Sequence, residues 1–191
     1  NDMIFPLFAK PSREGTGMGV TGQSIVHNEK QLRERIAHIL ERYKQPALVE
    51  QYIEGREVTL GLVGNLEGPV ARRLPENESA PRVQAGLRFF PPMEVDLKPY
   101  ENTDTVYSNR LKVAMADQLT YLCPAPLDND MIDELTWLTA AVFRVTGAND
   151  VSRVDFRLDV HDNWKPYILE INPLPGLSPG ISDLVIEAAA E

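Results

Sequence analysis

Two stretches of the chain have apolar residues at helical spacing. The first spans residues 28–44 and begins with Asn28, which together with Gln31 has the pattern of an N-terminal cap. The second spans residues 128–146 and ends before Gly147, a typical helix stop. The side chains expected to face the core are Leu32, Ile36, Ile39, Leu40 and Tyr43 in the first helix, and Met131, Ile132, Leu135, Leu138, Val142 and Val145 in the second.

Short apolar or alternating runs predict strands between and after these helices. A strand–loop–strand order around the first helix predicts a small α+β lobe over residues 1–54, and residues 55–191 form the rest. A long connection at about 98–120 is equally compatible with a lid and with a surface excursion. The expected strands are 4–9, 47–53, 57–63, short ones near Pro69–Leu74 and Leu87–Phe90, and the two strands of a hairpin at 152–172.

The hairpin at 152–172 has a predictable register, because burying one apolar face fixes which residues pair. We expect a loop at 161–164. The predicted pairs are Val154–Ile171, Phe156–Leu169 and Leu158–Tyr167 on the buried face, and Asp155–Glu170 and Arg153–Asn172 on the opposite face.

This register places two carboxylates side by side on the polar face of the hairpin. Cross-strand Cβ atoms lie about 5 Å apart, and like charges at about that distance repel by roughly 3 kcal/mol at an effective dielectric of about 20. A divalent cation held by Asp155, Glu170 and the Asn172 amide would offset the repulsion. Arg153 and Arg157 would offset it without a metal. The hairpin alone favours a metal site and an ion network equally.

A glycine-rich segment follows the first expected strand. Lys10 ends that strand, and Gly15, Gly17 and Gly19 come soon after it. A lysine in this position can place its charge on phosphate oxygens while backbone N–H groups of the loop bind others. The spacing fits neither the Walker A loop nor the dinucleotide fingerprint. The glycines alone are therefore a weak indication of a nucleotide.

Two further features are compatible with a nucleotide or an anion. Glu50 and Glu57 flank a strand and a turn, where they could accept hydrogen bonds from adenine and ribose, although exposed surface glutamates are the simpler interpretation. Residues 173–180 lead into a helix expected at about 181–190, and Gly176 there permits close approach of its backbone N–H. Taken alone, that loop is equally an ordinary strand-to-helix connection.

Composition excludes several classes of function. The 191 residues include 19 Lys and Arg and 28 Asp and Glu, for a net charge of −9. This charge argues against a sequence-independent nucleic-acid binder and against an anionic membrane surface. Cys123 cannot form an internal disulfide, and scattered histidines support neither a zinc site nor a Ser–His triad. We expect a cytoplasmic protein without nucleic-acid or membrane partners.

Taken together, these segments resemble the ATP-grasp superfamily and, within it, the D-alanine–D-alanine ligase family. The blocks occur in the family's order over nearly the whole chain, and the resemblance covers only the ATP-binding half of such enzymes. It implies an α+β fold of two lobes with mainly antiparallel sheets, and a fragment whose preceding domain is missing. The matching blocks are Phe8–Gly15, Leu48–Thr59, Tyr121–Ala125, Arg153–Phe156 and Leu169–Gly176.

The resemblance also implies a role for each matching residue. For the hairpin, it favours a metal site over an ion network without metal. Two Mg²⁺ ions, with Mn²⁺ as the alternative metal, would neutralise phosphate charge during transfer. An oxyanion would be stabilised as an amine attacks an acyl phosphate. The implied residues are Lys10, Gly15, Gly17 and Gly19 for ATP phosphates; Glu50, Gln51 and Ile53 for adenine; Glu57 for ribose; Asp155, Glu170 and Asn172 for the metal ions; and Arg153, Gly176 and Thr16 for catalysis.

Some positions depart from the family's pattern. Thr16-Gly17 stands where the family's loop usually has two adjacent serines. Ile181 stands where a serine usually grips the substrate carboxylate, with Ser182 next to it. The Lys-Tyr pair of the family's mobile loop is not recognisable, and Tyr107, Arg110 and Lys112 are only candidates for it. ATP and metal binding are therefore better supported than D-alanine specificity.

The resemblance implies an ATP-dependent carboxylate–amine ligase of peptidoglycan biosynthesis, acting on small amino-acid-like acids and amines, with a homodimer as the family's common assembly. The reaction would form an acyl phosphate and ADP from ATP and an acid, and then an amide by amine attack. Two rival hypotheses remain: a ligase for a different acid and amine, and a nucleotide-binding module without catalysis. We expect the fragment alone to be inactive.

Overall fold

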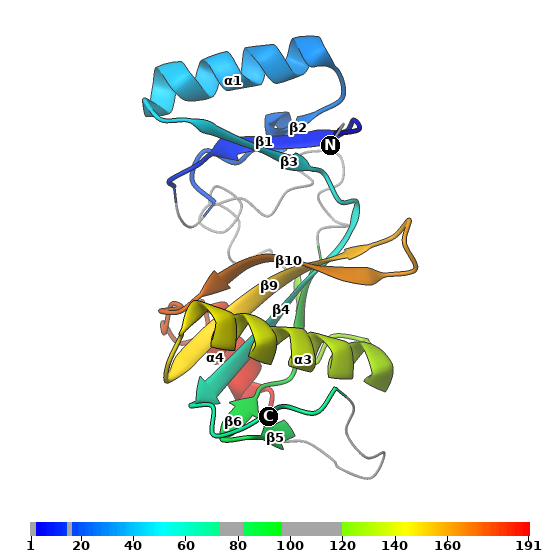
Figure 1. The fold of residues 1–191 in the computed structure, drawn as a ribbon, viewed down its shortest axis with the longest axis vertical. Helices are drawn as coiled ribbons and strands as arrows, with labels where there is room; N and C mark the ends of the chain where they lie inside the picture. Colours follow the sequence, from blue (N-terminus) through cyan, green and yellow to red (C-terminus); the bar gives the residue numbers. More distant parts are fainter. Residues whose placement is uncertain (1–2, 15–16, 73–81, 97–119) are drawn as a thin grey trace. The chain divides into compact units, whose positions relative to one another are not determined.

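The computed structural model describes residues 3–14, 17–72, 82–96 and 120–191, which form two compact units. The first unit is built from residues up to Ile53, and the second from Glu54–Val95 and Tyr121–Glu191 (Figure 1). Each unit is described by itself below. Among the described helices, none has the length and apolar character required to cross a bilayer.

The first unit is a small antiparallel sheet with one helix packed on it. The strand order is β2-β1-β3, and α1 packs against β1 (Figure 1). The predicted cap is confirmed, because the Asn28 side chain accepts from the backbone N–H of Gln31 at 3.0 Å. The bounds are β1 Leu7–Pro11, a 3-10 turn at Gly22–Ser24, β2 Ile25–Val26, α1 Glu29–Tyr43 and β3 Ala47–Gln51.

The buried face of α1 is confirmed at Ile39 and differs from the expected one at Leu40 and Arg35. Leu40 is 51% exposed, whereas the charged Arg35 is buried. The apolar stripe alone could not reveal this, because Arg35 buries its charge against oxygen acceptors of neighbouring segments. The start of β1 also differs, since the predicted strand at 4–9 begins at Leu7.

The second unit is a larger sheet whose strands follow the order β10-β9-β4-β6-β5, with β7 beside both β4 and β8. The pairs β4–β9 and β9–β10 are antiparallel, as the predicted fold class requires. The bounds are β4 Gly55–Gly64, β5 Arg82–Gln84, β6 Leu87–Phe89, β7 Met93–Asp96, β8 Thr120–Leu122, α3 Asn129–Thr146, β9 Val151–Asp159, β10 Lys165–Asn172 and α4 Asp183–Ala189.

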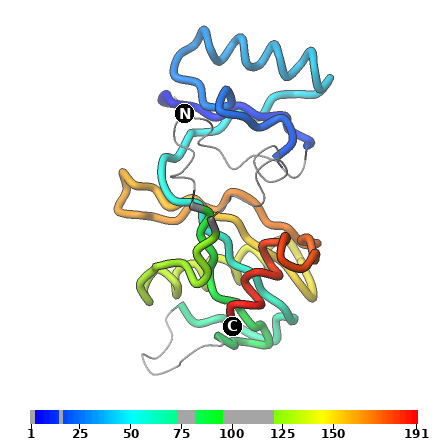
Figure 2. Tube along the Cα trace, turned by 180° about the vertical axis from the view of Figure 1, so that it is seen from behind, coloured from blue at the N-terminus to red at the C-terminus, as the bar shows by residue number. Residues whose placement is uncertain are grey.

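Helices cover both faces of this sheet, and the alternation of side chains decides which face each helix takes. Figure 1 shows α3 in front of the strands, and Figure 2 shows α4 on the other side. On the α3 face lies the core, with side chains at most 4% exposed. The core consists of Val58, Leu60, Leu62, Leu87, Phe89, Leu135, Ala140, Phe143, Val154, Phe156 and Leu158. The intervening residues of β4 and β9 therefore turn towards α4.

The second helix was predicted correctly in extent and in part of its buried face, since Leu135 lies in the core and Met131, Leu138 and Val142 pack against it. The Asp128 side chain caps α3 by accepting from Met131 N at 2.8 Å, and Gly147 ends the helix in the left-handed region. Leu135 lies in the core as expected. Val145, however, is 84% exposed, and Phe143 occupies the core instead. Thr136, Thr139 and Ala140 are buried as well, although they are too weakly apolar to mark a stripe in the sequence.

The hairpin register is confirmed at one end and wrong at the other. Asp155 pairs with Glu170, Val154 with Ile171 and Arg153 with Asn172, as predicted. A bulge between Ile168 and Glu170 then shifts the register by one residue. Phe156 therefore pairs with Ile168 instead of Leu169, and Leu158 pairs with Pro166 instead of Tyr167.

Elsewhere the short strands are only partly as expected. The strand at Leu87–Phe90 is confirmed as β6, whereas residues 69–72 form no strand and 73–74 lie outside the described residues. The strands β5, β7 and β8 were not predicted, because runs of three or four residues carry little periodicity. The predicted long loop at 98–120, with Tyr107, Arg110 and Lys112, lies outside the described residues up to position 119.

Candidate active site

Charged side chains alternate along β9 on the face that turns towards α4. Arg153, Asp155 and Arg157 are all 7–8% exposed. On the neighbouring strand β4 they lie opposite Gly61, Thr59 and Glu57, respectively. The site is therefore a strip of polar residues built into the middle of a sheet, whose opposite face is the apolar core.

The three predicted metal ligands meet at one end of this strip. The Asn172 Nδ2 atom donates to Asp155 Oδ2 at 3.0 Å and to Glu170 Oε1 at 3.2 Å. Asn172 and Glu170 come from β10, and Asp155 comes from β9. The correctly predicted part of the register brings these side chains together, and the bulge lies just beyond them.

Arg153 joins this group to α4. Its Nε and Nη2 atoms donate to Asp155 Oδ1 and Oδ2 at 2.7 and 2.8 Å, which is a bidentate pair. Its Nη1 atom lies 3.0 Å from Asp183 Oδ2. Burial by itself lowers the pKa of the guanidinium, but the hydrogen bond and charge of Asp155, with the charge of Asp183, raise the pKa above its ordinary value. Arg153 is therefore a fixed, permanently charged cation.

Glu187 lies beneath the charged strip. It is fully buried, and Thr59 Oγ1 donates to its Oε1 atom, while no residue in the described part of the chain donates to its Oε2 atom. Burial raises the pKa of Glu187 to about 8, against the opposing effects of Thr59 and Arg153. Burial and the nearby Glu187 also raise the pKa of Cys123 to about 11, which keeps that thiol protonated at neutral pH.

The donor set at the end of the strip suits a hard divalent cation. Two carboxylates and an amide oxygen are the ligands that Mg²⁺ prefers, and rotation of the Asn172 amide would turn its oxygen towards the carboxylates it now donates to. Among the described residues, no group of three or more His, Cys, Asp or Glu side chains has an arrangement that could hold a metal. Here the two carboxylates are completed by the Asn172 amide, so the residues fit the ion by their chemistry.

Glu57, the predicted ribose ligand, lies on the same face further along the sheet. Its Oε2 atom accepts from Arg157 Nη2 at 2.8 Å, and the two residues are direct cross-strand neighbours. Arg157 therefore pairs with Glu57. Of the ion network considered from the sequence, the pair of Arg153 with Asp155 is present.

In the first unit, Lys10 and Glu50 form an ion pair. The Lys10 Nζ atom lies 2.7 Å from Glu50 Oε2, and the residues come from the paired strands β1 and β3. The side chains are 29% and 41% exposed. The side chain of Gln51 instead binds backbone atoms of the N-terminal segment, donating to Ile4 O at 2.8 Å, and Ile53 follows in an extended connection without strand pairing.

The glycine-rich segment is anchored at its end. A β-carbon on Gly19 would lie 2.7 Å from Pro11 Cγ, and the Gly19 carbonyl accepts from the buried Arg35. Gly17, at φ 70°, accepts from the N–H of Val20 at 3.1 Å. The predicted residues Gly15 and Thr16 lie outside the described residues. Gly19 is therefore a structural anchor of the segment.

The loop between β10 and α4 brings Gly176 against Ser182. A β-carbon on Gly176 would lie 2.7 Å from Ser182 Oγ, so only glycine fits there without a shift. Ser182 Oγ also accepts from Ser178 N at 3.0 Å. Ile181, at the position of the missing serine, is 69% exposed, as are Leu177 at 66% and Leu174 at 89%.

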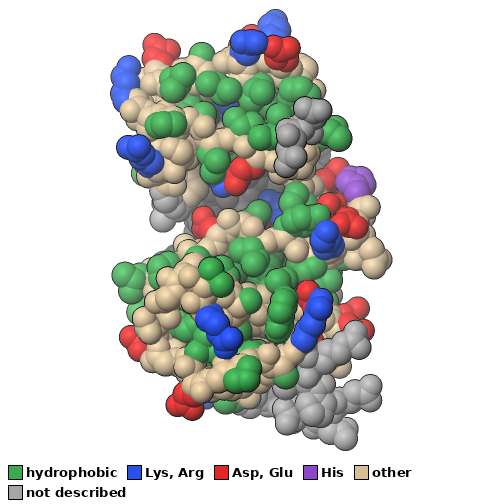
Figure 3. Space-filling model, viewed as in Figure 1, with side chains coloured by type: hydrophobic (Ala, Val, Ile, Leu, Met, Phe, Trp, Pro, Cys, Tyr) green, Lys and Arg blue, Asp and Glu red, His purple; other side chains and the backbone are tan. Residues whose placement is uncertain are grey.

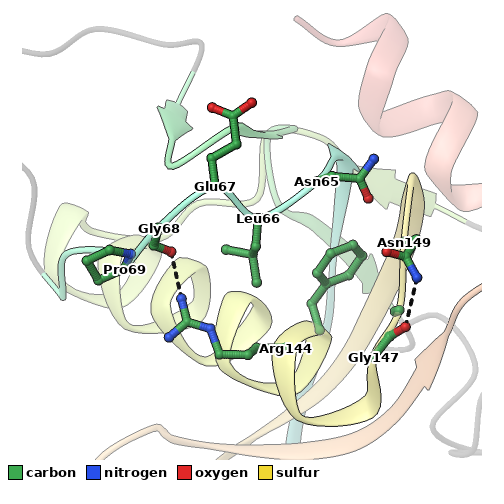
Figure 4. Close-up of a pocket in the computed structure, with 10 residues that line it drawn as sticks. Asn65, Leu66, Glu67, Gly68, Pro69, Arg144, Gly147 and Asn149 are labelled. Atoms are coloured by element: carbon green, nitrogen blue, oxygen red, sulfur yellow. Dashed lines mark hydrogen bonds between the residues drawn. The ribbon is translucent and has the colours of Figure 1, made fainter.

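A separate pocket lies on the other side of the sheet. Its volume is about 610 Å³, and Figure 4 shows that it lies between the segment after β4 and the end of α3. Arg144 donates to Gly68 O at 2.6 Å across it. Figure 3 shows that charged side chains of both signs are interspersed with apolar ones on the face that carries α3. None of the predicted site residues lines this pocket, which also includes Asn65, Leu66, Glu67, Pro69, Phe143, Gly147, Ala148 and Asn149.

Sequence reasoning missed three buried charged residues at these sites: Arg35, Asp183 and Glu187. The spacing of Asp183 and Glu187 was an available signal, because residues four apart lie on one helical face, here together with Leu184. Arg35 had no comparable signal, since its acceptors are the Ala9 and Gly19 carbonyls and the Ser24 hydroxyl.

The antiparallel sheets, the polar strip and the helices on both faces are those of an ATP-grasp protein. The family model described as "D-ala D-ala ligase C-terminus" matches residues 1–79 and 91–188, and the chain belongs to this family.

Individual relatives agree with this assignment. The "Uncharacterized protein y4sG" of Sinorhizobium fredii is 32% identical over 178 residues, covering 93% of this chain and 45% of that protein. A D-alanine--D-alanine ligase of Methylibium petroleiphilum is 31% identical over 178 residues, covering 93% and 47%. The structure of a Bacillus anthracis D-alanine--D-alanine ligase complexed with ATP has a similar fold, with a TM-score of 0.60 and 18% identity over 97% of this chain and 47% of that one. The chain thus spans about half the length of the curated relatives it matches.

Proposed function

We propose that this chain is the ATP-binding half of a cytoplasmic ATP-dependent ligase that joins the carboxyl group of one small molecule to the amine of another. The observation that carries the proposal is the meeting of Asp155, Glu170 and Asn172 beside the fixed cation Arg153. Family membership supports it. One solved structure with this fold is a D-alanine--D-alanine ligase complexed with ATP, and a sequence relative is also a D-alanine--D-alanine ligase.

In this proposal the polar strip binds the reacting end of the nucleotide. Asp155, Glu170 and Asn172 would hold two Mg²⁺ ions, or Mn²⁺, which when bound neutralise phosphate charge. Arg153 would supply a permanent positive charge for the oxyanion that forms when the amine attacks, together with the Gly176 N–H. Phosphoryl transfer needs positioning and cations rather than a protein nucleophile, which agrees with the protonated state of Cys123.

The other predicted residues would contact further parts of the nucleotide. The ion pair between Lys10 and Glu50 would break, so that Lys10 binds phosphate and Glu50 binds adenine. Gln51 and Ile53 would bind adenine through backbone groups. Glu57 would take the ribose hydroxyls while Arg157 orients its carboxylate. Gly15, Thr16, Gly17 and Gly19 would close over the phosphates, with Arg35 fixing the end of that segment through Gly19.

A second candidate is a ligase that joins a pair other than two D-alanines, and the loop after β10 favours it. Ile181, at the position where the family usually has a serine, offers no hydroxyl to a substrate carboxylate. Leu174, Leu177 and Ile181 instead expose large apolar side chains. An acid or amine with an apolar body would cover them.

The test is ATP-dependent phosphate release by the full-length protein over a panel of amino acids and other amines. We expect release that requires one acid and one amine, and amide formation detected by mass spectrometry. Turnover with D-alanine alone would select the first candidate, and turnover with apolar amino acids or amines the second. ATP binding without any substrate-dependent release would overturn the ligase and leave a nucleotide-binding module.

A further inference from the structure

We propose that Asp183 is a positioning residue: it retains Arg153 in the site while Asp155 exchanges the guanidinium for a metal ion. The inference rests on the proposed function, because it presumes the metal set of Asp155, Glu170 and Asn172. It concerns α4, to which the predicted site assigns no charged residue.

Arg153 is held by two carboxylates from different elements. Asp155, on the same strand, takes the Nε and Nη2 atoms, and Asp183, on α4, lies 3.0 Å from Nη1. The three side chains are at most 12% exposed. The two carboxylates thus contact different nitrogen atoms, and either contact can persist when the other is broken.

Arg153 and a metal ion would compete for the same oxygen atoms. Both carboxylate oxygens of Asp155 accept from Arg153, and Oδ2 also accepts from Asn172. A cation on either oxygen would lie beside an N–H of the guanidinium, and repulsion between the two positive charges therefore favours breaking the N–H···O bonds from Arg153. The guanidinium cannot give up its charge, and leaving it buried without a partner is strongly unfavourable. Asp183 provides that partner.

Asp183 can hold Arg153 because α4 is itself closely fitted to the sheet. At Gly61, a β-carbon would lie 2.3 Å from both Leu184 Cδ1 and Glu187 Oε2. Thr59 donates to Glu187 one helical turn beyond Asp183. The helix therefore presents the Asp183 carboxylate from a fixed position, independent of any movement of the Asp155 side chain.

The experiment measures metal binding by the full-length protein without nucleotide, using Mn²⁺ followed by electron paramagnetic resonance and Mg²⁺ followed by calorimetry. In Asp183→Asn, Arg153 loses a carboxylate partner and holds Asp155 more firmly, so we expect binding to weaken on the order of tenfold. Asp133→Asn is the matched control, because Asp133 is a buried carboxylate of α3 paired with Arg82. It should leave metal binding within about twofold of wild type. If the midpoint of the metal titration is unchanged in Asp183→Asn, or shifts equally in Asp133→Asn, the proposal is overturned.

A double variant separates positioning from a general effect of charge. Arg153→Met removes the competing cation, so metal binding should tighten, and adding Asp183→Asn should then have no further effect. If Asp183→Asn weakens binding equally in both backgrounds, Asp183 acts through its charge or as a direct ligand, and the positioning role is wrong. Arg153→Gln, which also lacks the charge, serves in place of Arg153→Met if circular dichroism shows that the methionine variant is unfolded.

The result also distinguishes this inference from the proposed function. The midpoint of the metal titration could shift in Asp183→Asn while wild type shows no substrate-dependent phosphate release. That result would support the positioning role and reject the ligase. Phosphate release with an unshifted midpoint would support the ligase and reject the positioning role. Absence of any metal binding by wild type would reject both the metal set and the exchange.

Discussion

Gly61 and Glu187 approach each other so closely that a β-carbon on residue 61 would lie 2.3 Å from Glu187 Oε2. We predict that Gly61→Ala destabilises the second unit by about 1–3 kcal/mol, the usual cost of inserting a methyl group into a packed interior. Gly68→Ala is the control, since a β-carbon there meets nothing within 4 Å. Denaturant unfolding monitored by tryptophan fluorescence would measure both. Equal stability of the two variants would contradict the close fit of α4.

Glu187 should make the stability of the protein depend on pH. Burial raises its pKa from 4.5 to about 8, so between these values the folded state binds a proton that the unfolded state has released. The contribution of Glu187 to the free energy of unfolding therefore falls as pH rises, by up to about 1.4 kcal/mol per pH unit. It levels off above the pKa of the folded state. Arg153, Asp155 and Asp183 also act on this group.

The variant Glu187→Gln should remove this contribution, because its side chain does not titrate. We expect the difference in unfolding free energy between wild type and variant to decrease steadily in urea titrations from pH 5.5 to 7.5. A difference that stays constant over this range would mean that Glu187 is already ionised in the folded protein.

Glu170 is the more exposed carboxylate of the predicted metal set, so its removal tests that set with little disturbance of the fold. We predict that Glu170→Ala weakens Mg²⁺-dependent ATP binding more than about tenfold. Asp162→Ala, at the exposed tip of the same hairpin, should have no effect, because Asp162 contacts Lys165 and Tyr167 of the hairpin itself. Calorimetric titration with ATP and Mg²⁺ measures both variants, and unchanged binding in Glu170→Ala would discredit the metal assignment.

Arg35 should stabilise the first unit far more than an exposed arginine of the same helix. Its buried guanidinium donates to Ala9 O at 3.2 Å and Ser24 Oγ at 2.9 Å, and it also binds Gly19 O. We expect Arg35→Met to cost roughly 2–4 kcal/mol, since hydrogen bonds to charged groups contribute about 1.5–3 kcal/mol each. Arg33→Met breaks only the exposed pair with Glu29 and should cost less than about 0.5 kcal/mol.

Limited proteolysis gives a second measurement of the same role of Arg35. Loss of its bond to the Gly19 carbonyl should increase cleavage near Gly17–Val20 in Arg35→Met but not in Arg33→Met. Equal cleavage of the two variants would indicate that Pro11 and Tyr43 alone anchor Gly19.

The parts of the fold that were predictable from sequence are those governed by local chemistry. Asn28 and Asp128 cap their helices with their own side chains, and Gly147 adopts the left-handed conformation that ends a helix. The alternation on β9 also predicted which residues would share the polar face. Burial of Val154 and Ile171 on one side then sufficed to pair Asp155 with Glu170.

The rest depended on tertiary packing that no local pattern records. Leu40 and Val145 have the spacing of core residues but are exposed, because the partners of each helix leave room for Arg35 and Phe143 instead. Asp183 and Glu187 are polar in sequence, yet both are buried, since Arg153 and Thr59 on the sheet receive them. The register slip at Leu169 likewise has no signature in the alternation of its strand.

That bulge at Leu169 separates the distal turn of the hairpin from its chemical end. Because an irregularity already absorbs one residue between them, a change in length around His161–Asn163 would be taken up before it reached Asp155 and Glu170. The turn is thus a place where a short peptide or a fluorescent label could be inserted while the carboxylates keep their spacing.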